Sequence, residues 1–357
     1  MKVKSLKLKN FRNYELLDLE FDESTNIFYG NNAQGKTNIL EAVFLSATTK
    51  SHRGAKDRDM IRFGCEEAHI ETVIEKKGIE YTIDMHLKKN SHKGVAVGKI
   101  PIRRASELFG IVNIVFFSPE DLNIIKNGPS ERRRFIDLEL SQIDKIYLNN
   151  LSRYNKIVNQ RNHLLKEGRD LSTLDIWDMQ LVEYGNKIID RRNNFISELN
   201  EIVGEMHRKI TGDKENLLLI YEPNNKDIPL DIALKKNRER DIRYKMTTVG
   251  PHRDDICFMV GDLDIRRFGS QGQQRSAALS LKLSEIELVK KVVGDTPILL
   301  LDDVLSELDK HRQNYLLDNI YDIQTLITCT GVDEFVNHRF SVDKVFHVDN
   351  GIVEKEN

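Results

Sequence analysis

The stretch Gly30–Thr37, with the sequence GNNAQGKT, fits the pattern G-x-x-x-x-G-K-[ST]. In this pattern the glycines let consecutive backbone N–H groups turn inward around a phosphate, while the lysine reaches the outer phosphates and the hydroxyl binds magnesium. Residues 24–29 have strand-like composition, and residues 38–45 favour a helix. A strand that leads into a helix N-terminus supplies the free donors and the dipole that an anion needs. The sequence therefore predicts a phosphate-binding loop between a strand and a helix.

A second constraint is an apolar run, residues 297–301, that ends in Asp302 and Asp303. Such a run is typical of a central parallel strand buried on both faces. A carboxylate at its tip would hold magnesium together with Thr37, and Asp303 would orient or deprotonate an attacking water. A polar strand end that only caps a helix is the simpler alternative. The phosphate loop in the same chain favours Thr37 and Asp302 as metal ligands, and Lys36, Asp302 and Asp303 as catalytic residues.

The spacing of these motifs indicates a divided domain, because Lys36 and Asp302 lie near opposite ends of the 357-residue chain. Residues 1–127 alternate short β-rich runs with turns, and residues 241–357 return to an α/β pattern. Residues 128–240 carry apolar side chains at helical spacing. We therefore expect an α/β fold in which 1–127 and 241–357 are the halves of one nucleotide-binding head, and 128–240 are an inserted helical lobe.

Two amphipathic helices are expected within this lobe, with apolar stripes over residues 147–158 and 184–206 and a connection at 163–174. They would pack as an antiparallel hairpin with its own core. The stripes are too short and irregular for a sustained coiled coil.

Composition narrows the class of protein. Hydrophobic residues make up 39% of the chain and charged residues 31%, as in a soluble globular protein. No stretch approaches 18 uninterrupted apolar residues, which argues against a membrane span. The cysteines at 65, 257 and 329 are scattered and are interpreted as reduced thiols. We expect a cytoplasmic, nucleoid-associated protein with no membrane partner.

Two further segments complete a recognisable set. Ser270–Arg275 (SQGQQR) precedes an apolar helix, and Ser306–Asp309 (SELD) follows the acid pair. Each is weak evidence alone, since one is an ordinary loop and the other an ordinary helix cap. In this order, the four segments resemble the ATP-binding cassette superfamily. Gly30–Thr37 is similar to its Walker A motif, Ser270–Arg275 to its signature motif, Leu299–Asp303 to its Walker B motif and Ser306–Asp309 to its D-loop.

This resemblance implies a split P-loop ATPase head with a parallel or mixed sheet and flanking helices, which uses ATP and Mg²⁺. In the superfamily two subunits sandwich ATP, and the signature serine of one contacts the γ-phosphate held by the other. It therefore implies an ATP-dependent homodimer and a catalytic role for Ser270. The residues expected to contact the nucleotide are Arg12, Gly30, Asn31, Asn32, Ala33, Gln34, Gly35, Lys36, Thr37, Asn38, Ser270, Gly272 and Gln273.

The chain departs from the superfamily pattern at three places. Asp303 stands where glutamate is usual. Because the side chain of aspartate is one methylene shorter, its carboxylate would lie further from the attacking water. Thr328 and Thr330 occupy the region of the usual switch histidine, and residues 118–121 lack the glutamine of the Q-loop. The shorter side chain of Asp303 predicts slow hydrolysis.

Within the superfamily the chain resembles the bacterial RecF family, which is related to SMC-type ATPases. The resembling segments are 8–14 (LKNFRNY), 50–53 (KSHR), 117–122 (FSPEDL), 128–137 (GPSERRRFID) and 250–255 (GPHRDD). The resemblance implies an ATP-bound dimer that clamps double-stranded DNA near single-strand gaps. With RecR and RecO as partners, it would help load recombinase during recombinational repair and replication restart.

The distribution of charge gives separate support for DNA binding. The formal net charge is −2, but residues 126–166 hold nine Lys or Arg against four Asp or Glu. Clusters of this kind suit phosphate contacts without sequence preference, although most are solvated helix faces. The residues predicted to contact DNA are Lys50, Arg53, Lys56, Arg58, Arg132 and Arg133.

Three alternatives remain at this point. A transporter's ATPase subunit would lack the inserted lobe and carry the usual glutamate and histidine. A P-loop kinase would transfer phosphate to a small molecule, and the signature-like segment argues against it. A nucleotide-gated scaffold that does not act on DNA has the same binding residues.

Overall fold

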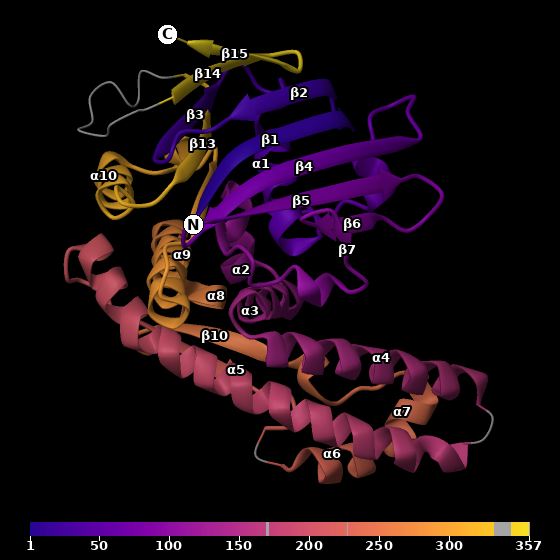
Figure 1. Cartoon of the computed structure of the whole chain (residues 1–357). Coiled ribbons are helices and arrows are strands. Elements are labelled where there is room, and N and C mark those ends of the chain that lie inside the picture. Colours follow the sequence, from indigo (N-terminus) through magenta and orange to yellow (C-terminus); the bar gives the residue numbers. More distant parts are fainter. Residues whose placement is uncertain (169–170, 227, 332–343, 357) are drawn as a thin grey trace. The chain divides into compact units, whose positions relative to one another are not determined.

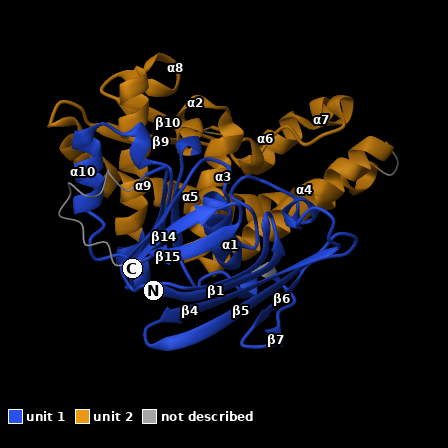
Figure 2. Cartoon of the chain, turned by 90° about the horizontal axis from the view of Figure 1, so that it is seen from above, with its two compact units in different colours: residues 1–120, 289–357 blue, residues 121–288 orange. Residues whose placement is uncertain are grey.

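The computed structural model describes residues 1–168, 171–226, 228–331 and 344–356. The elements are labelled in Figure 1. The chain forms two compact units, coloured separately in Figure 2: residues 1–120 with 289–357, and residues 121–288.

A six-stranded sheet in the first unit joins the two ends of the chain. Its order is β15-β14-β3-β13-β12-β8. The strands are β3 (Thr25–Tyr29), β8 (Ile114–Phe117), β12 (Ile298–Asp302), β13 (Thr325–Cys329), β14 (Lys344–Asp349) and β15 (Ile352–Glu356). All neighbours pair in parallel except β14 with β15. Every residue of β12 and β13 is buried, as a strand covered on both faces requires. The expected split α/β head is confirmed.

The first unit also contains an antiparallel sheet in the order β2-β1-β4-β5-β6-β7. Its strands are β1 (Lys2–Phe11), β2 (Tyr14–Glu20), β4 (Glu67–Lys76), β5 (Ile79–Lys88), β6 (Gly94–Val97) and β7 (Ile100–Pro101). Strands β4 and β5 form a hairpin that turns at Lys77 and Gly78. Two longer helices belong to this unit, α1 (Lys36–Thr48) and α10 (Lys310–Asp318).

The second unit combines helices with a small sheet. Its helices are α2 (Leu122–Lys126), α3 (Pro129–Ile143), α4 (Lys145–Glu167), α5 (Leu174–Thr211), α6 (Leu230–Lys236), α7 (Arg238–Tyr244), α8 (Ile265–Phe268) and α9 (Gln271–Val293). The residues of α9 from Val289 onward are counted with the first unit. The sheet β11-β10-β9 consists of β9 (Leu217–Glu222), β10 (Asp255–Val260) and β11 (Leu263–Asp264). Helices α4 and α5 pack side by side, as expected for a helical hairpin (Figure 1).

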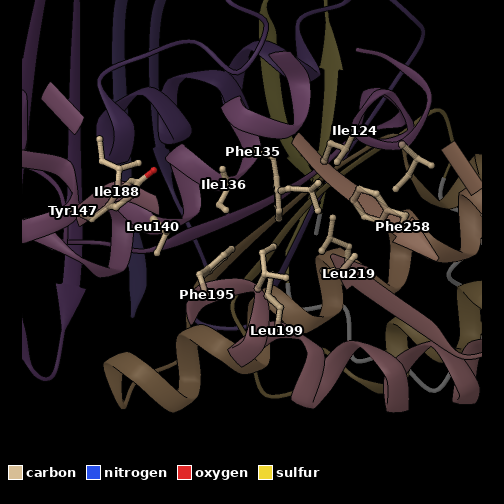
Figure 3. Close-up of a cluster of buried hydrophobic side chains, with 14 of the residues drawn as sticks. Ile124, Phe135, Ile136, Leu140, Tyr147, Ile188, Phe195, Leu199, Leu219 and Phe258 are labelled. Carbon is tan, nitrogen blue, oxygen red and sulfur yellow. The ribbon is translucent and has the colours of Figure 1, made fainter. Parts of the chain in front are cut away.

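The boundary between the units differs from the expected one at residue 240. Residues 241–288 pack with the lobe because β10 pairs with β9, and because Ala277, Leu281 and Leu288 of α9 enter the lobe's hydrophobic core. Phe135, Phe195 and Phe258 belong to the same core (Figure 3). The lobe is therefore a mixed α/β unit rather than purely helical.

Buried arginines tie together the two segments 128–137 and 250–255. Arg132 binds both carboxylate oxygens of Asp255, at 2.5 and 3.0 Å. Arg192 of α5, also buried, donates to Asp137 at 2.7 Å and to Asp254 at 3.2 Å. Breaking a buried pair strands a charge in the interior, so these contacts are expected to hold the lobe in one arrangement.

Among the described residues, no helix has both the length and the apolar character needed to span a membrane.

Candidate nucleotide site

The phosphate loop connects the end of β3 to the start of α1 and requires glycine at both of its ends. Gly30 has φ 149°, and a Cβ there would lie 2.3 Å from the carbonyl oxygen of Val348 in the neighbouring strand β14. Gly35 has φ 116°, and a Cβ there would lie 2.5 Å from Asn13 Nδ2. Side chains rarely adopt such backbone angles, and these contacts leave no room for one. The tip residues Asn31, Asn32 and Ala33 are exposed.

The loop is braced by residues that motif matching did not assign to the site. Asn13 Nδ2 donates to the carbonyl of Gln34 at 2.8 Å, and the Tyr14 hydroxyl donates to that of Gly35 at 3.1 Å. Asn38 donates to Asn13 Oδ1 at 2.8 Å. Asn13 and Tyr14 lie in the segment 8–14 that carries the family resemblance, which was the signal available in the sequence. Both side chains hold the loop's backbone rather than face a phosphate.

Lys36 lies inside the loop that it serves. Its Nζ donates to the carbonyls of Gly30 and Asn31, at 2.6 and 2.8 Å. Burial lowers the pKa of Lys36, while the carboxylates of Asp303 and Asp302 act in the opposite direction. The amine is therefore held among acceptors at the mouth of the loop, where phosphate oxygens would replace the carbonyls.

Thr37 and Asp302 are brought together although they are far apart in sequence. The Thr37 hydroxyl donates to Asp302 Oδ1 at 2.7 Å, and the Thr328 hydroxyl donates to the same oxygen at 2.7 Å. Burial raises the pKa of Asp302, and these two hydrogen bonds oppose the shift. A hydroxyl and a carboxylate at this distance fit Mg²⁺, which binds one or two protein oxygens together with phosphate. The fit supports Thr37 and Asp302 as the predicted ligands.

Asp303 follows the strand tip with a left-handed backbone, at φ 55°. Its N–H donates to Thr328 Oγ1 at 3.0 Å and lies 3.2 Å from the Thr328 carbonyl oxygen. Thr328 thus contacts both acids of the pair. Its hydroxyl orients Asp302, and its position beside Asp303 fixes the turn that carries the predicted base.

Arg12, predicted to contact the nucleotide, is engaged by protein groups. Its guanidinium donates to both carboxylate oxygens of Glu41, at 2.7 and 2.8 Å, and to the Asp59 carbonyl at 2.9 Å. Ser51 also donates to Glu41, at 2.5 Å. Burial acts to raise the pKa of Glu41, but the hydrogen bonds from Arg12 and Ser51 outweigh it, and the pKa is lowered. Arg12 neutralises a buried acid of α1, and its nucleotide contact stays a prediction.

The signature segment belongs to the second unit and begins α9. Ser270 is exposed, its N–H donates to Gln273 Oε1 at 2.9 Å, and the Gln273 N–H donates to Ser270 Oγ at 3.2 Å. This reciprocal pair is a capping box at a helix N-terminus. Gly272, in the first turn, is exposed.

The predicted DNA contacts fall into two groups. Lys50, Arg53, Lys56 and Arg58 are exposed in the first unit. The predicted DNA contact of Arg132 is corrected. This side chain is buried, and its guanidinium donates to Asp255 and to carbonyls of residues 124–127. A phosphate cannot reach it without breaking that pair. Arg133 is half-buried and donates to the Asp254 carbonyl at 2.7 Å, and its DNA contact stays a prediction.

The mostly parallel sheet, the phosphate loop before α1 and the acid pair at the end of β12 define a P-loop ATPase head of the kind shared by cassette and SMC proteins. At 16% identity and a TM-score of 0.59, the fold matches the SMC head solved with the C-winged helix domain of ScpA, over 100% of this chain and 97% of that one. The model of the RecF/RecN/SMC N terminal domain matches residues 2–354.

The particular family follows from closer relatives. The chain is 65% identical to the DNA replication and repair protein RecF of Agathobacter rectalis, over 99% of each. It is 59% identical to that of Lachnospira eligens over the whole of both. The solved structure of the recombination mediator protein RecF with ATP, in the RecFOR pathway, matches with a TM-score of 0.92 at 37% identity, over 99% of this chain and 97% of that one. The chain belongs to the RecF family.

Proposed function

We propose that this chain binds ATP and Mg²⁺ in its phosphate loop, dimerises around the nucleotide and clamps double-stranded DNA near single-strand gaps. With RecR and RecO it would promote recombinase loading in recombinational repair and replication restart, and slow hydrolysis would reset it. The observation that carries the proposal is the convergence of Lys36, Thr37 and Asp302 at one loop mouth. The names of its relatives, and a relative's structure with ATP, support the same role.

Each residue has a defined task in this proposal. The amides of the loop and the Lys36 amine bind the β- and γ-phosphates, with Lys36 exchanging its carbonyl acceptors for phosphate oxygens. Thr37 and Asp302 hold Mg²⁺, which neutralises charge that develops on the phosphates. Asp303 orients the attacking water, and an exposed Ser270 from the second copy contacts the γ-phosphate. Each half-site is then incomplete until two copies meet.

Sedimentation of the protein with and without ATP, and with and without labelled duplex DNA, tests the proposal. We expect a monomer that dimerises and gains DNA affinity only with ATP. Lys36→Met should lose both, because it removes the amine that holds the outer phosphates. A wild-type protein that stays monomeric at saturating ATP would exclude the sandwich mechanism.

The main alternative is a nucleotide-gated scaffold that does not act on DNA, and the short side chain of Asp303 is compatible with it. The labelled duplex in the same experiment separates the two: an ATP-dependent dimer with unchanged DNA affinity would favour the scaffold. Steady-state turnover well above about 10 per second, the median for enzymes, would contradict slow hydrolysis.

A further inference from the structure

The signature serine is connected by hydrogen bonds to the segment that follows the long helix α5. In the capping box, Gln273 uses its amide oxygen to accept from the Ser270 N–H. The amide nitrogen of the same side chain donates to Glu215 Oε1 at 2.9 Å. One planar amide therefore joins Ser270 to Glu215, and a rotation of that amide would break both hydrogen bonds.

Glu215 is itself held in place by the end of α5. Its N–H donates to Thr211 Oγ1 at 3.3 Å, and that hydroxyl donates to the His207 carbonyl at 2.8 Å. The neighbouring Asn216 lies against α5 at Gly204, where a Cβ would be 2.8 Å from Asn216 Oδ1. The absence of a side chain at Gly204 lets the segment lie close to the helix, so Glu215 has little freedom to move.

A buried histidine lies beside the second oxygen of Glu215. His207 is fully buried, and its Nε2 lies 3.4 Å from Glu215 Oε2, close enough for an ion pair when the ring is protonated. Its Nδ1 lies 2.9 Å from Ser280 Oγ on α9. The Ser280 hydroxyl has one hydrogen, which it donates to the Ser276 carbonyl at 2.7 Å, so it accepts from Nδ1–H. Hydrogen bonds hold Glu215 to α5 through Thr211 and to α9 through Gln273.

We infer that Glu215, acting through Gln273, is a positioning residue for Ser270, and that it presets the signature serine for the γ-phosphate of ATP held by a second copy. The inference rests on the proposed function. Ser270 Oγ accepts from the Gln273 N–H, so its own O–H is left to donate outward from an exposed position. Holding a donor in its binding orientation removes the ordering cost from the dimerisation step.

The test separates the two halves of the site. The phosphate loop binds ATP in the monomer, whereas Ser270 acts only in the dimer. We expect Glu215→Ala to leave the affinity of the dilute monomer for a fluorescent ATP analogue unchanged. It should raise the Kd for ATP-dependent dimerisation, measured by sedimentation, about tenfold, as expected for losing a hydrogen bond to a charged group. Glu215→Gln, which keeps an acceptor oxygen, should stay near wild type.

Two further variants separate positioning from general damage. Gln273→Glu keeps the acceptor for Ser270 but faces Glu215 with a second carboxylate, and dimerisation should weaken. Combining it with Glu215→Gln exchanges amide and carboxylate and should restore much of the affinity. The matched control is Glu205→Gln on α5, an exposed acid paired with Lys209, which should behave as wild type.

The outcomes are distinct. Three results would overturn the inference and leave the proposed function standing. Glu215→Ala could dimerise as wild type, or its monomer could lose ATP affinity as much as its dimerisation weakens. The double variant Gln273→Glu, Glu215→Gln could also fail to recover dimerisation. A wild-type protein that does not dimerise with ATP would overturn the proposed function, and this inference with it.

Discussion

At the scale of single residues, Asp303 shows how backbone geometry bears on the choice of a base. Its φ of 55° lies in the left-handed region, which aspartate and asparagine tolerate better than longer side chains. The aspartate that stands in place of the usual glutamate therefore suits the turn beside Thr328. We predict that Asp303→Asn keeps this turn and loses the base, so that turnover falls about 100-fold or more.

The same variant should still dimerise with ATP, because Lys36, Thr37 and Asp302 are unchanged. Phosphate release and sedimentation, measured on one preparation, check both parts. Full turnover by Asp303→Asn would show that another group orients the water.

The positions of site residues were predictable where a motif dictates geometry and not where tertiary packing decides; their roles stay predictions. Lys36, Thr37 and Asp302 come together as expected because the motif specifies their chemistry. The run of arginines predicts a DNA contact for Arg132, yet this side chain faces the interior, since a charge run does not say which member finds a buried acid. Asn13 holds the loop through a hydrogen bond to Gln34, and its signal in the sequence was the family resemblance of segment 8–14 rather than a motif.

At the scale of elements, α3 and α9 place three ionisable side chains in the interior of the lobe, and these side chains interact electrostatically. Lys282 of α9 donates to Glu285 at 2.6 Å, and Glu139 of α3 is also buried. Burial raises the pKa of Glu139 to about 7, with Lys282 opposing the shift and Asp121 adding to it. Burial also raises the pKa of Glu285, again opposed by Lys282. One lysine faces two buried glutamates whose pKa values are both raised, so we expect the folded lobe to retain a proton below about pH 7.

This retained proton predicts a pH dependence of stability. A carboxyl whose pKa is raised by folding binds more protons in the folded state, so the free energy of unfolding falls as pH rises from about 4.5 to 7 and levels off above that. Glu139→Gln should remove about 3 kcal/mol of this fall. Fluorescence of the single tryptophan, Trp177, which packs against the lobe's core, reports urea unfolding at pH 5 and pH 8.

The control for this measurement is Glu183→Gln, an exposed acid of α5 paired with Lys187. It should leave the difference between the two pH values as in wild type. If Glu139→Gln does the same, then Glu139 is ionised in the folded lobe and the retained proton resides elsewhere.

The sequence predicted the strongly periodic elements well, but it did not predict which of the two units each element packs into. The apolar run of β12 indicates a strand buried on both faces, and the alternation of apolar and polar residues in β4 and β5 indicates strands buried on one face. The pairing of β9 with β10 joins residues on either side of the expected boundary at 240, and local patterns carry no information about such pairing. The lobe therefore extends to residue 288 rather than 240.

At the scale of the whole molecule, a net charge of −2 means that any DNA affinity must come from where positive charge is exposed, not from its sum. With Arg132 removed, the remaining candidates are the half-buried Arg133 and the exposed Lys and Arg residues of segment 50–58. We predict that Lys56→Gln combined with Arg58→Gln weakens duplex binding at saturating ATP. The slope of log K against log salt should fall by about 0.9 for each DNA phosphate that the variant no longer binds.

Two exposed lysines serve as the control for Lys56 and Arg58. They distinguish a loss of contacts at segment 50–58 from an effect of the chain's total charge. Lys235→Gln with Lys236→Gln, on α6, removes the same charge from the chain. It should leave the salt slope unchanged if binding depends on segment 50–58. An equal decrease in affinity from both pairs would mean that DNA responds to total charge, and Lys56 and Arg58 would then not touch the duplex. Because phosphates carry no base information, the decrease should be the same for duplexes of different sequence.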